Sequence, residues 1–343
     1  MNGENRELNL SVNRFCAQMG QDPFWVQGAG GNVSSKDSEV MWIKASGTCL
    51  AQAMQKNIFV PVNFKKMSEA LLQDEYSFTP QVMGDSPLRP SIEVLLHGLM
   101  SNRIVVHLHL ISALIHLVKT DAKNIISNLV GDAFAWGYID YCKPGLELAG
   151  AVSTLLKTRN NLDVIFLGNH GVVIGADTVE KASELLRLLD KLMGRDFLIK
   201  EKPTKTHEVK GQMVIGGFQW CSNPILNSLA IDDNYLKWVL DAWALFPDHV
   251  VFLGEKALIV DGLNDLNNIS LKQLTKEPFI FVRNVGVLQS DLVSSAQLEQ
   301  LLCYHNVISN LDSRVSVKCL SLHEIAGLLN WDAEVYRQSM SKQ

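Results

Sequence analysis

The sequence predicts an α/β protein with two domains. Its 343 residues exceed the length of one average domain, and 47% of them are hydrophobic, which is enough for two buried cores. Short β-branched apolar runs alternate along the chain with longer segments of helical periodicity. A charged segment with few apolar residues, 200–213, interrupts this pattern and is typical of a linker. We therefore expect a first domain over residues 1–199, a linker over 200–215 and a smaller second domain over 216–343.

Charge and cysteine content favour an ordinary cytoplasmic protein. The net charge is −5 and no Lys or Arg stripe is present, so we expect no nucleic-acid partner. The polar N-terminus lacks a signal-peptide core, and the longest apolar runs are shorter than the roughly 20 residues of a membrane span. We therefore expect no membrane partner. The six cysteines form no CxxC pair, which indicates a reducing compartment.

Apolar periodicity and turn residues place the expected elements. In the first domain they predict a helix ending near Gly20, a glycine-rich loop over 27–35, strands over 40–45, 104–109, 163–167 and 172–174, and helices over 93–100, 111–118, 121–129 and 178–198. In the second domain they predict helices near 234–244, 294–311 and 322–329, and strands over 249–253, 257–260 and 278–282.

Two segments of the chain are similar to each other. Phe166-Leu-Gly-Asn-His-Gly-Val-Val is followed by a polar break and an apolar-periodic helix, and Phe281-Val-Arg-Asn-Val-Gly-Val-Leu is followed by the same arrangement. If the similarity reflects a repeat, the second domain is a degenerate copy of part of the first. Val285 then occupies the position of His170, so the copy lacks that histidine.

Three histidines are candidates for a metal site. His107 and His109 lie two residues apart in an expected strand, so both imidazoles project from the same face. His170 follows another expected strand, and Gly171 is expected to let the backbone turn tightly there. Three protein ligands that leave coordination positions open are typical of catalytic zinc. His97 lies nearby on an expected helix, and we interpret it as a packing residue.

A carboxylate and two glycine turns accompany these histidines. Glu93 lies near the start of an expected helix. It could act as an acid/base group in proton transfer, or it could only provide a negative charge that interacts favourably with the helix dipole. The Gly28–Ser34 segment is not a dinucleotide fingerprint, but its backbone N–H groups suit an anion. Lys44-Ala-Ser46-Gly47 adds a charge, a hydroxyl group and a further donor. The alternative is that both segments are simply tight turns.

Taken together, these segments resemble the class II aldolase/adducin family. In the family's order they are GAGGNVS (28–34), KASG (44–47), PSIE (90–93), VVHLH (105–109), YCKPGLELA (141–149) and NHG (169–171). The resemblance covers about residues 8–198 and implies an α/β/α sandwich around a mainly antiparallel sheet. It also implies a homo-oligomer, usually a tetramer. Residues 216–343 would then form an additional, smaller α/β domain.

The resemblance also implies a function. Members of the family cleave or isomerise small sugar phosphates with a divalent ion, commonly Zn2+. Carried over by position, the three metal ligands are His107, His109 and His170, and Glu93 is the acid/base carboxylate. The phosphate-binding positions are Gly31, Asn32, Ser46, Gly47 and Ser91. The expected activity is that of a metal-dependent aldehyde-lyase acting on a small sugar or sugar phosphate through a metal-stabilised enediolate.

The sequence departs from the family pattern near the substrate. Ala29 and Ile92 stand where phosphate-binding members carry hydroxyl residues, and Lys44 is the residue that would compensate. The tyrosine that protonates the aldehyde product has two candidates, Tyr138 and Tyr141, of which we assign Tyr141. The same site would also serve an epimerase or a dehydratase. A non-catalytic scaffold like the adducin branch is the other alternative, and the retained histidines weigh against it.

Overall fold

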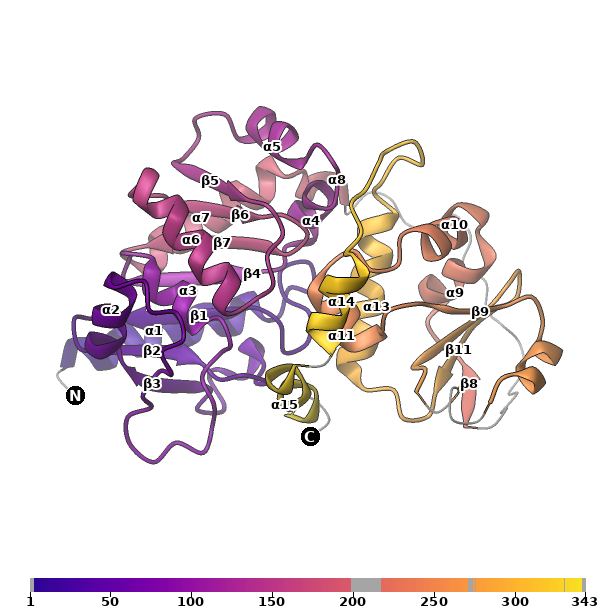
Figure 1. Ribbon diagram of the computed structural model, residues 1–343, viewed down its shortest axis with the longest axis horizontal. Coiled ribbons are helices and arrows are strands. Elements are labelled where there is room, and N and C mark those ends of the chain that lie inside the picture. The colour runs from indigo at the N-terminus through magenta and orange to yellow at the C-terminus, as the bar shows by residue number, and fades with distance from the viewer. Residues whose placement is uncertain (1–2, 199–216, 271–273, 275, 330, 341–343) are drawn as a thin grey trace. The chain divides into compact units, whose positions relative to one another are not determined.

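The computed structural model describes residues 3–198, 217–270, 274, 276–329 and 331–340 (Figure 1). The chain divides into two compact units, which are described separately. Unit 1 comprises Met1–Leu117, Asp121–Arg195 and Asp332–Gln343, and unit 2 comprises Val118–Thr120 and Asp196–Trp331. The predicted linker lies outside the described residues, and the predicted domain boundaries therefore stay predictions.

A seven-stranded sheet forms the centre of unit 1. Its strands lie in the order β3-β2-β1-β4-β7-β6-β5, and only the β5–β6 pair is parallel. The strands are β1 (Asn32–Lys36), β2 (Val40–Lys44), β3 (Phe59–Asn63), β4 (Ile104–Leu108), β5 (Trp136–Ile139), β6 (Val164–Leu167) and β7 (Gly171–Ala176). The predicted glycine-rich loop is therefore shorter than expected, because β1 begins at Asn32 and pairs there with β4.

Helices cover both faces of this sheet. They are α1 (Gly3–Met19), α2 (Phe64–Leu72), α3 (Val94–Leu99), α4 (Ile111–Leu117), α5 (Ala122–Val130), α6 (Leu146–Thr158) and α7 (Val179–Leu192), with the short η1 (Leu50–Gln52). α15 (Asp332–Met340) also belongs to unit 1. Because side chains alternate along a strand, Val106 and Leu108 of β4 pack with α1, α4, α5 and α7, whereas Val105 packs with α3 and α6. The α/β/α sandwich with a mainly antiparallel sheet is confirmed.

The predicted helix over 178–198 is interrupted. α7 ends at Leu192, and Gly194 follows with a φ of 91° before the short α8 (Arg195–Leu198) begins. A glycine in the left-handed region ends a helix because no Cβ opposes that conformation.

The turn between β6 and β7 also differs in detail from the prediction. Asn169, not Gly171, adopts the left-handed conformation, with a φ of 53°. Gly171 instead allows close packing, because a Cβ there would lie 2.4 Å from the backbone oxygen of Leu108. Asparagine tolerates the left-handed region better than most residues, which explains the exchange of roles. The glycine therefore holds β7 against the end of β4.

Unit 2 contains a four-stranded sheet in the order β8-β11-β10-β9. Its elements are β8 (Phe218–Trp220), α9 (Pro224–Ile231), α10 (Asp233–Asp241), α11 (Pro247–Leu253), β9 (Leu258–Val260), η2 (Leu263–Asn268), β10 (Phe279–Val282), β11 (Gly286–Ser290), α13 (Ser295–Ile308) and α14 (Leu322–Leu329). The strand prediction for 249–253 is wrong, because α11 covers these residues. Pro247 starts the helix, and every residue in it is buried, so its sequence shows no amphipathic period.

The two sheets share a topology. β4-β7-β6-β5 and β8-β11-β10-β9 have the same strand directions, with one parallel pair at the same edge of each. Asn284 has a φ of 60° and occupies the place of Asn169 in the equivalent hairpin. Trp220 lies opposite Leu288 as His107 lies opposite Val173. These parallels support the proposal that unit 2 is a degenerate copy, with Trp220 and Val285 at two of the histidine positions.

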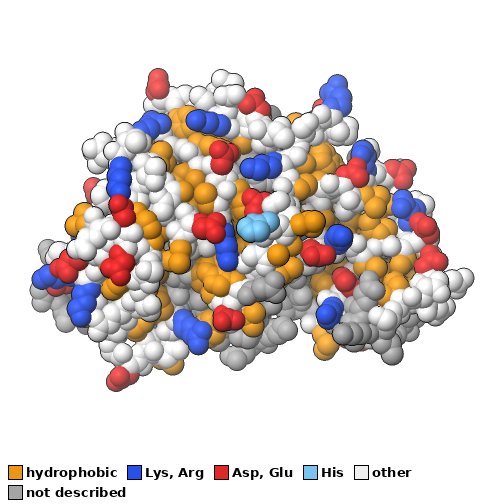
Figure 2. Space-filling view, viewed as in Figure 1, with side chains coloured by type: hydrophobic (Ala, Val, Ile, Leu, Met, Phe, Trp, Pro, Cys, Tyr) orange, Lys and Arg blue, Asp and Glu red, His pale blue; other side chains and the backbone are white. Residues whose placement is uncertain are grey.

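The surface carries charges of both signs. On the face shown in Figure 2, acidic and basic side chains of the described residues lie interspersed among apolar ones. The exposed pair Lys157–Asp74, with Nζ 2.6 Å from a carboxylate oxygen, is an example. Among the described helices, none combines the length and apolarity that crossing a membrane requires.

We predict that Gly171→Ala destabilises unit 1. The new methyl group would collide with the Leu108 carbonyl, so the β4–β7 pairing must shift at a cost of about 1–3 kcal/mol. Urea unfolding of the purified variant measures this loss. Gly150→Ala is the control, because a Cβ on that glycine would make only an ordinary contact, 3.7 Å from the Tyr76 ring, and its φ is not positive. Equal stability of Gly171→Ala and wild type would contradict the assignment.

Candidate metal centre

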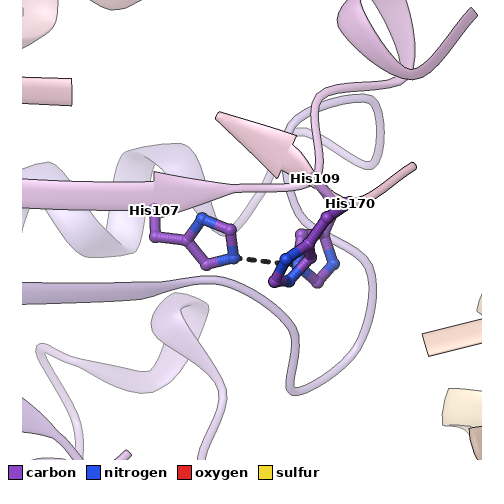
Figure 3. Close-up of side chains that lie close together, drawn as sticks. All are labelled: His107, His109 and His170. Carbon is purple, nitrogen blue, oxygen red and sulfur yellow. Dashed lines mark hydrogen bonds between the residues drawn. The ribbon is translucent and has the colours of Figure 1, made fainter. Parts of the chain in front are cut away.

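Three imidazoles converge at the end of β4. His107 lies in the strand, His109 just beyond it, and His170 comes from the β6–β7 turn, so the β4–β7 pairing brings the three together (Figure 3). Their ring centroids lie 4.8–5.2 Å apart. One nitrogen from each ring can be chosen so that all three lie within 4.8 Å of one another, and all three side chains are buried. The sequence prediction placed these residues together, and the structure does the same.

The hydrogen bonds of His107 orient its ring for coordination. Its Nδ1 lies 3.0 Å from the backbone oxygen of Val172, which only accepts, so Nδ1 carries the hydrogen. Nε2 then presents its lone pair toward His109 Nε2, 3.1 Å away. Nitrogens bound to one tetrahedral Zn2+ at about 2.0–2.1 Å lie about 3.3 Å apart, so this spacing is close to that of a shared ion. The three histidines therefore fit a divalent metal.

Glu93 closes the site from the side of α3. It is the N-cap residue of that helix, and its backbone N–H donates to Ser91 Oγ at 3.3 Å. One carboxylate oxygen lies 3.4 Å from His107 Nε2 and the other 3.4 Å from His170 Nε2. The carboxylate is only 6% exposed. Glu93 therefore lies within reach of any group held by the histidines.

The surroundings of Glu93 keep it ionised. Burial raises its pKa, but the neighbouring imidazoles of His107 and His170 and a hydrogen bond from Asn32 have the larger, opposite effect and lower the pKa to about 2. Asn32 Nδ2 donates to Glu93 at 2.9 Å. Because it is ionised, the carboxylate has the protonation state that a proton acceptor requires.

The two predicted anion-binding turns lie close to this centre. Gly31 has a φ of 64°, and a Cβ there would lie 3.1 Å from the backbone oxygen of His107. Lys44 Nζ donates to the Ala29 oxygen at 3.0 Å, which ties the glycine loop to β2. Ser91 N donates to the Lys44 oxygen at 3.0 Å, and Ser46 N donates to the neighbouring Arg89 oxygen at 2.9 Å. These hydrogen bonds join the glycine loop, the end of β2 and the Arg89–Ser91 segment. The predicted anion-binding residues lie in or directly beside these three segments: Gly31, Asn32, Lys44, Ser46, Gly47 and Ser91.

Comparison with known families identifies this arrangement. The family described as "Class II Aldolase and Adducin N-terminal domain" matches residues 12–194, more than half of the chain. The chain belongs to the class II aldolase and adducin family. All the metal-centre residues lie within the matched range, and unit 2 lies almost entirely beyond it.

Two relatives are 26% identical to this class II aldolase-family chain over the segments that align. The "Uncharacterized oxidoreductase YuxG" of Bacillus subtilis is 26% identical over 178 residues, and the match covers 47% of this chain and 25% of that protein. The chain thus spans about a quarter of that relative. The "L-fuculose phosphate aldolase" of Methanococcus vannielii is 26% identical over 175 residues, covering 50% and 87% of the two chains.

Solved structures show similar domains at low identity. A class II aldolase domain from Thermoplasma acidophilum covers 55% of this chain and 92% of its own, at 21% identity and a TM-score of 0.45. A sugar-phosphate aldolase from Thermotoga maritima covers 59% and 100%, at 14% identity and a TM-score of 0.45.

The candidate tyrosines of this class II aldolase-family chain flank the β6–β7 turn. A Cβ on Gly168 would lie 2.8 Å from the Tyr138 hydroxyl and 3.3 Å from the Tyr141 backbone nitrogen. Burial raises the pKa of Tyr138 to about 12. Tyr141 follows β5, which ends beside the turn that carries His170. The role of Tyr141 as proton donor stays a prediction.

Sequence reasoning missed a second layer around Glu93. His97, interpreted as a packing residue, is fully buried and lies with its Nε2 against Asn32 Oδ1. Its Nδ1 lies 2.8 Å from Ser34 Oγ. Lys36 Nζ donates to the backbone oxygens of His97 and Met100. The signal was the alternation Asn-x-Ser-x-Lys in a buried strand, which the assignment of 27–35 to a loop concealed.

We predict that the chain binds about one divalent ion and that His107→Ala/His109→Ala loses it. Loss of two of three ligands should lower the affinity for Zn2+ by more than about 100-fold, because even the partners of metal ligands change affinity by 10- to 100-fold. Elemental analysis and calorimetric titration measure both quantities. His323→Ala, which removes an exposed histidine, is the control. Equal metal binding by the double variant and wild type would refute the site.

Proposed function

We propose that this chain is a divalent-metal-dependent lyase of the aldolase type that acts on a small sugar or sugar phosphate. The observation that carries the proposal is the placement of Glu93, whose two carboxylate oxygens lie 3.4 Å from two of the candidate metal ligands. Family membership supports an aldolase-like enzyme. The M. vannielii relative bears the name of an L-fuculose phosphate aldolase, which agrees with a sugar-phosphate substrate.

The histidines and Glu93 have different roles in the proposed reaction: the histidines bind the metal and Glu93 transfers a proton. His107, His109 and His170 would hold the ion, and three nitrogen ligands with an open position favour Zn2+. Such an ion supplies Lewis acidity to a carbonyl oxygen and an adjacent hydroxyl oxygen. In the synthetic direction, the ionised Glu93 carboxylate would take a proton from a carbon of the three-carbon fragment to give an enediolate, and Tyr141 would give its proton to the aldehyde oxygen as the carbon–carbon bond forms. Cleavage would be the reverse: the substrate hydroxyl would give its proton to the Tyr141 phenolate as the carbon–carbon bond breaks, and the protonated Glu93 would return its proton to the enediolate carbon.

The adjoining turns would hold the other end of the substrate. The backbone groups of Gly31 and Gly47 and the hydroxyl groups of Ser46 and Ser91 are the proposed anion contacts. Asn32 engages Glu93 and His97 through its side chain, so its main role would be to hold Glu93. Lys44 supplies a positive charge in place of the hydroxyl groups lost at Ala29 and Ile92. Tyr141 is the proposed proton donor to the aldehyde oxygen.

Proton exchange on the three-carbon product tests the role of Glu93. In D2O, the metal-loaded enzyme should exchange a carbon-bound hydrogen of dihydroxyacetone phosphate or dihydroxyacetone, which proton NMR follows directly. Glu93→Gln should slow this exchange by about 100-fold or more, because a positioned acid/base group contributes 10²–10⁴-fold. Its metal content should not change.

Glu147→Gln is the matched control, because that carboxylate lies exposed in the first turn of α6. L-Fuculose 1-phosphate and L-rhamnulose 1-phosphate then test cleavage itself. Wild-type exchange rates in Glu93→Gln would contradict the proposed role, and the absence of both exchange and cleavage in the metal-loaded wild type would contradict the lyase.

Lys44→Met tests whether Lys44 contacts a phosphate group of the substrate. If Lys44 lies beside a phosphate, its removal should raise KM for dihydroxyacetone phosphate by about 10- to 100-fold, which is the value of one hydrogen bond to a charged group. KM for dihydroxyacetone should stay within a few-fold of wild type. Lys65→Met, which removes an exposed lysine, is the control. Equal changes for both substrates would show that Lys44 only supports the loop through Ala29.

A further inference from the structure

The strand β1 presents a polar strip to the helix that carries Glu93. Asn32, Ser34 and Lys36 alternate along β1, so their side chains leave the same face of the sheet. All three are buried, at 6% exposure or less. Each contacts Glu93 or α3. Asn32 contacts Glu93 at the start of the helix, Ser34 contacts the His97 ring, and Lys36 contacts backbone oxygens at the end of the helix. Buried polar groups cost free energy unless they are paired, and each of these is paired.

The direction of each hydrogen bond in this strip follows from the orientation of the Asn32 amide. Its nitrogen faces Glu93 and donates to Oε2 at 2.9 Å. The Asn32 oxygen then faces His97 Nε2, and because that oxygen only accepts, Nε2 must carry the hydrogen. Burial lowers the pKa of His97 well below its usual value, so the ring is neutral and Nδ1 accepts from Ser34 Oγ.

We infer that His97 is a positioning residue for Glu93: through the Asn32 amide it fixes where the carboxylate lies and which of its oxygens is engaged. The inference rests on the proposed role of Glu93 in proton transfer. Ser34 holds the His97 ring, His97 holds the Asn32 oxygen, and the Asn32 nitrogen holds Glu93 Oε2. Glu93 Oε1, on the side of His170, takes no part in this series of hydrogen bonds, and it is the oxygen that accepts and returns the proton.

Lys36 fixes the other end of the same arrangement. Its Nζ donates to the backbone oxygens of His97 at 2.6 Å and Met100 at 2.5 Å, so the end of α3 is tied to β1. With Asn32 at the start of the helix and Lys36 at its end, α3 has little freedom to slide along the strand. The position of Glu93 relative to His107, on the neighbouring strand, is therefore set by β1.

Two substitutions of His97 test the inference. His97→Gln keeps a donor near the Nε2 position, whereas His97→Phe keeps a ring but removes the donor and leaves the Asn32 oxygen unpaired. We expect His97→Phe to lower kcat for hydrogen exchange of dihydroxyacetone phosphate by about 10- to 100-fold, with KM within about threefold of wild type. His97→Gln should recover most of this loss. Both variants should bind Zn2+ with wild-type stoichiometry.

The tautomer of His97 gives a readout that does not depend on activity. Long-range proton–nitrogen NMR of the histidine rings in the Zn2+-loaded wild type should show His97 with hydrogen on Nε2 and a lone pair on Nδ1. Hydrogen on Nδ1 would overturn the inference, even if His97→Phe failed to fold. Wild-type kcat in His97→Phe would also overturn it. Full exchange activity in Glu93→Gln would instead refute the proposed role of Glu93. The His97 tautomer would still show whether Nε2 donates to the Asn32 oxygen.

Discussion

The ionised Glu93 carboxylate, buried beside three imidazoles, is the interaction on which the rest of the site depends. Burial alone would neutralise this group, and its charge is retained because the histidines and the Asn32 amide stabilise it. Those partners come from β1, β4 and the β6–β7 turn, so the surroundings of the carboxylate are complete only where these elements meet.

The order of the central strands meets this requirement. β4 lies between β1 and β7, and the pairing of His107 with Asn32 on one side and Val173 on the other fixes both neighbours in register. Gly171 permits the close contact of β7 with the end of β4, and Asn169 turns the chain so that His170 faces the same space. α3 then brings Glu93 over the strand ends. In unit 2 the same strand order persists, with Trp220 and Val285 at the positions of His107 and His170.

Much of this arrangement could be predicted from the sequence because its signals are local. His107 and His109 share a face by the period of a strand, and Glu93 precedes a helical run, so each residue could be placed on its element. The resemblance to class II aldolases supplied what local patterns lack, namely that these elements meet. The second layer of His97, Ser34 and Lys36 could not be predicted, because its members matter only through the pairing of β1 with α3. The α11 helix was missed because a fully buried helix shows no polar face.

We propose that His107, His109 and His170 together hold one divalent ion beside Glu93. X-ray absorption spectroscopy of the Zn2+-loaded protein tests it most directly, because it reports the identity and distance of the atoms around the metal. We expect imidazole nitrogen at about 2.0–2.1 Å from the metal, fitted by three histidines, with the remaining ligand atoms being oxygen. A shell with sulfur at about 2.3 Å, or one composed of oxygen alone, would contradict it.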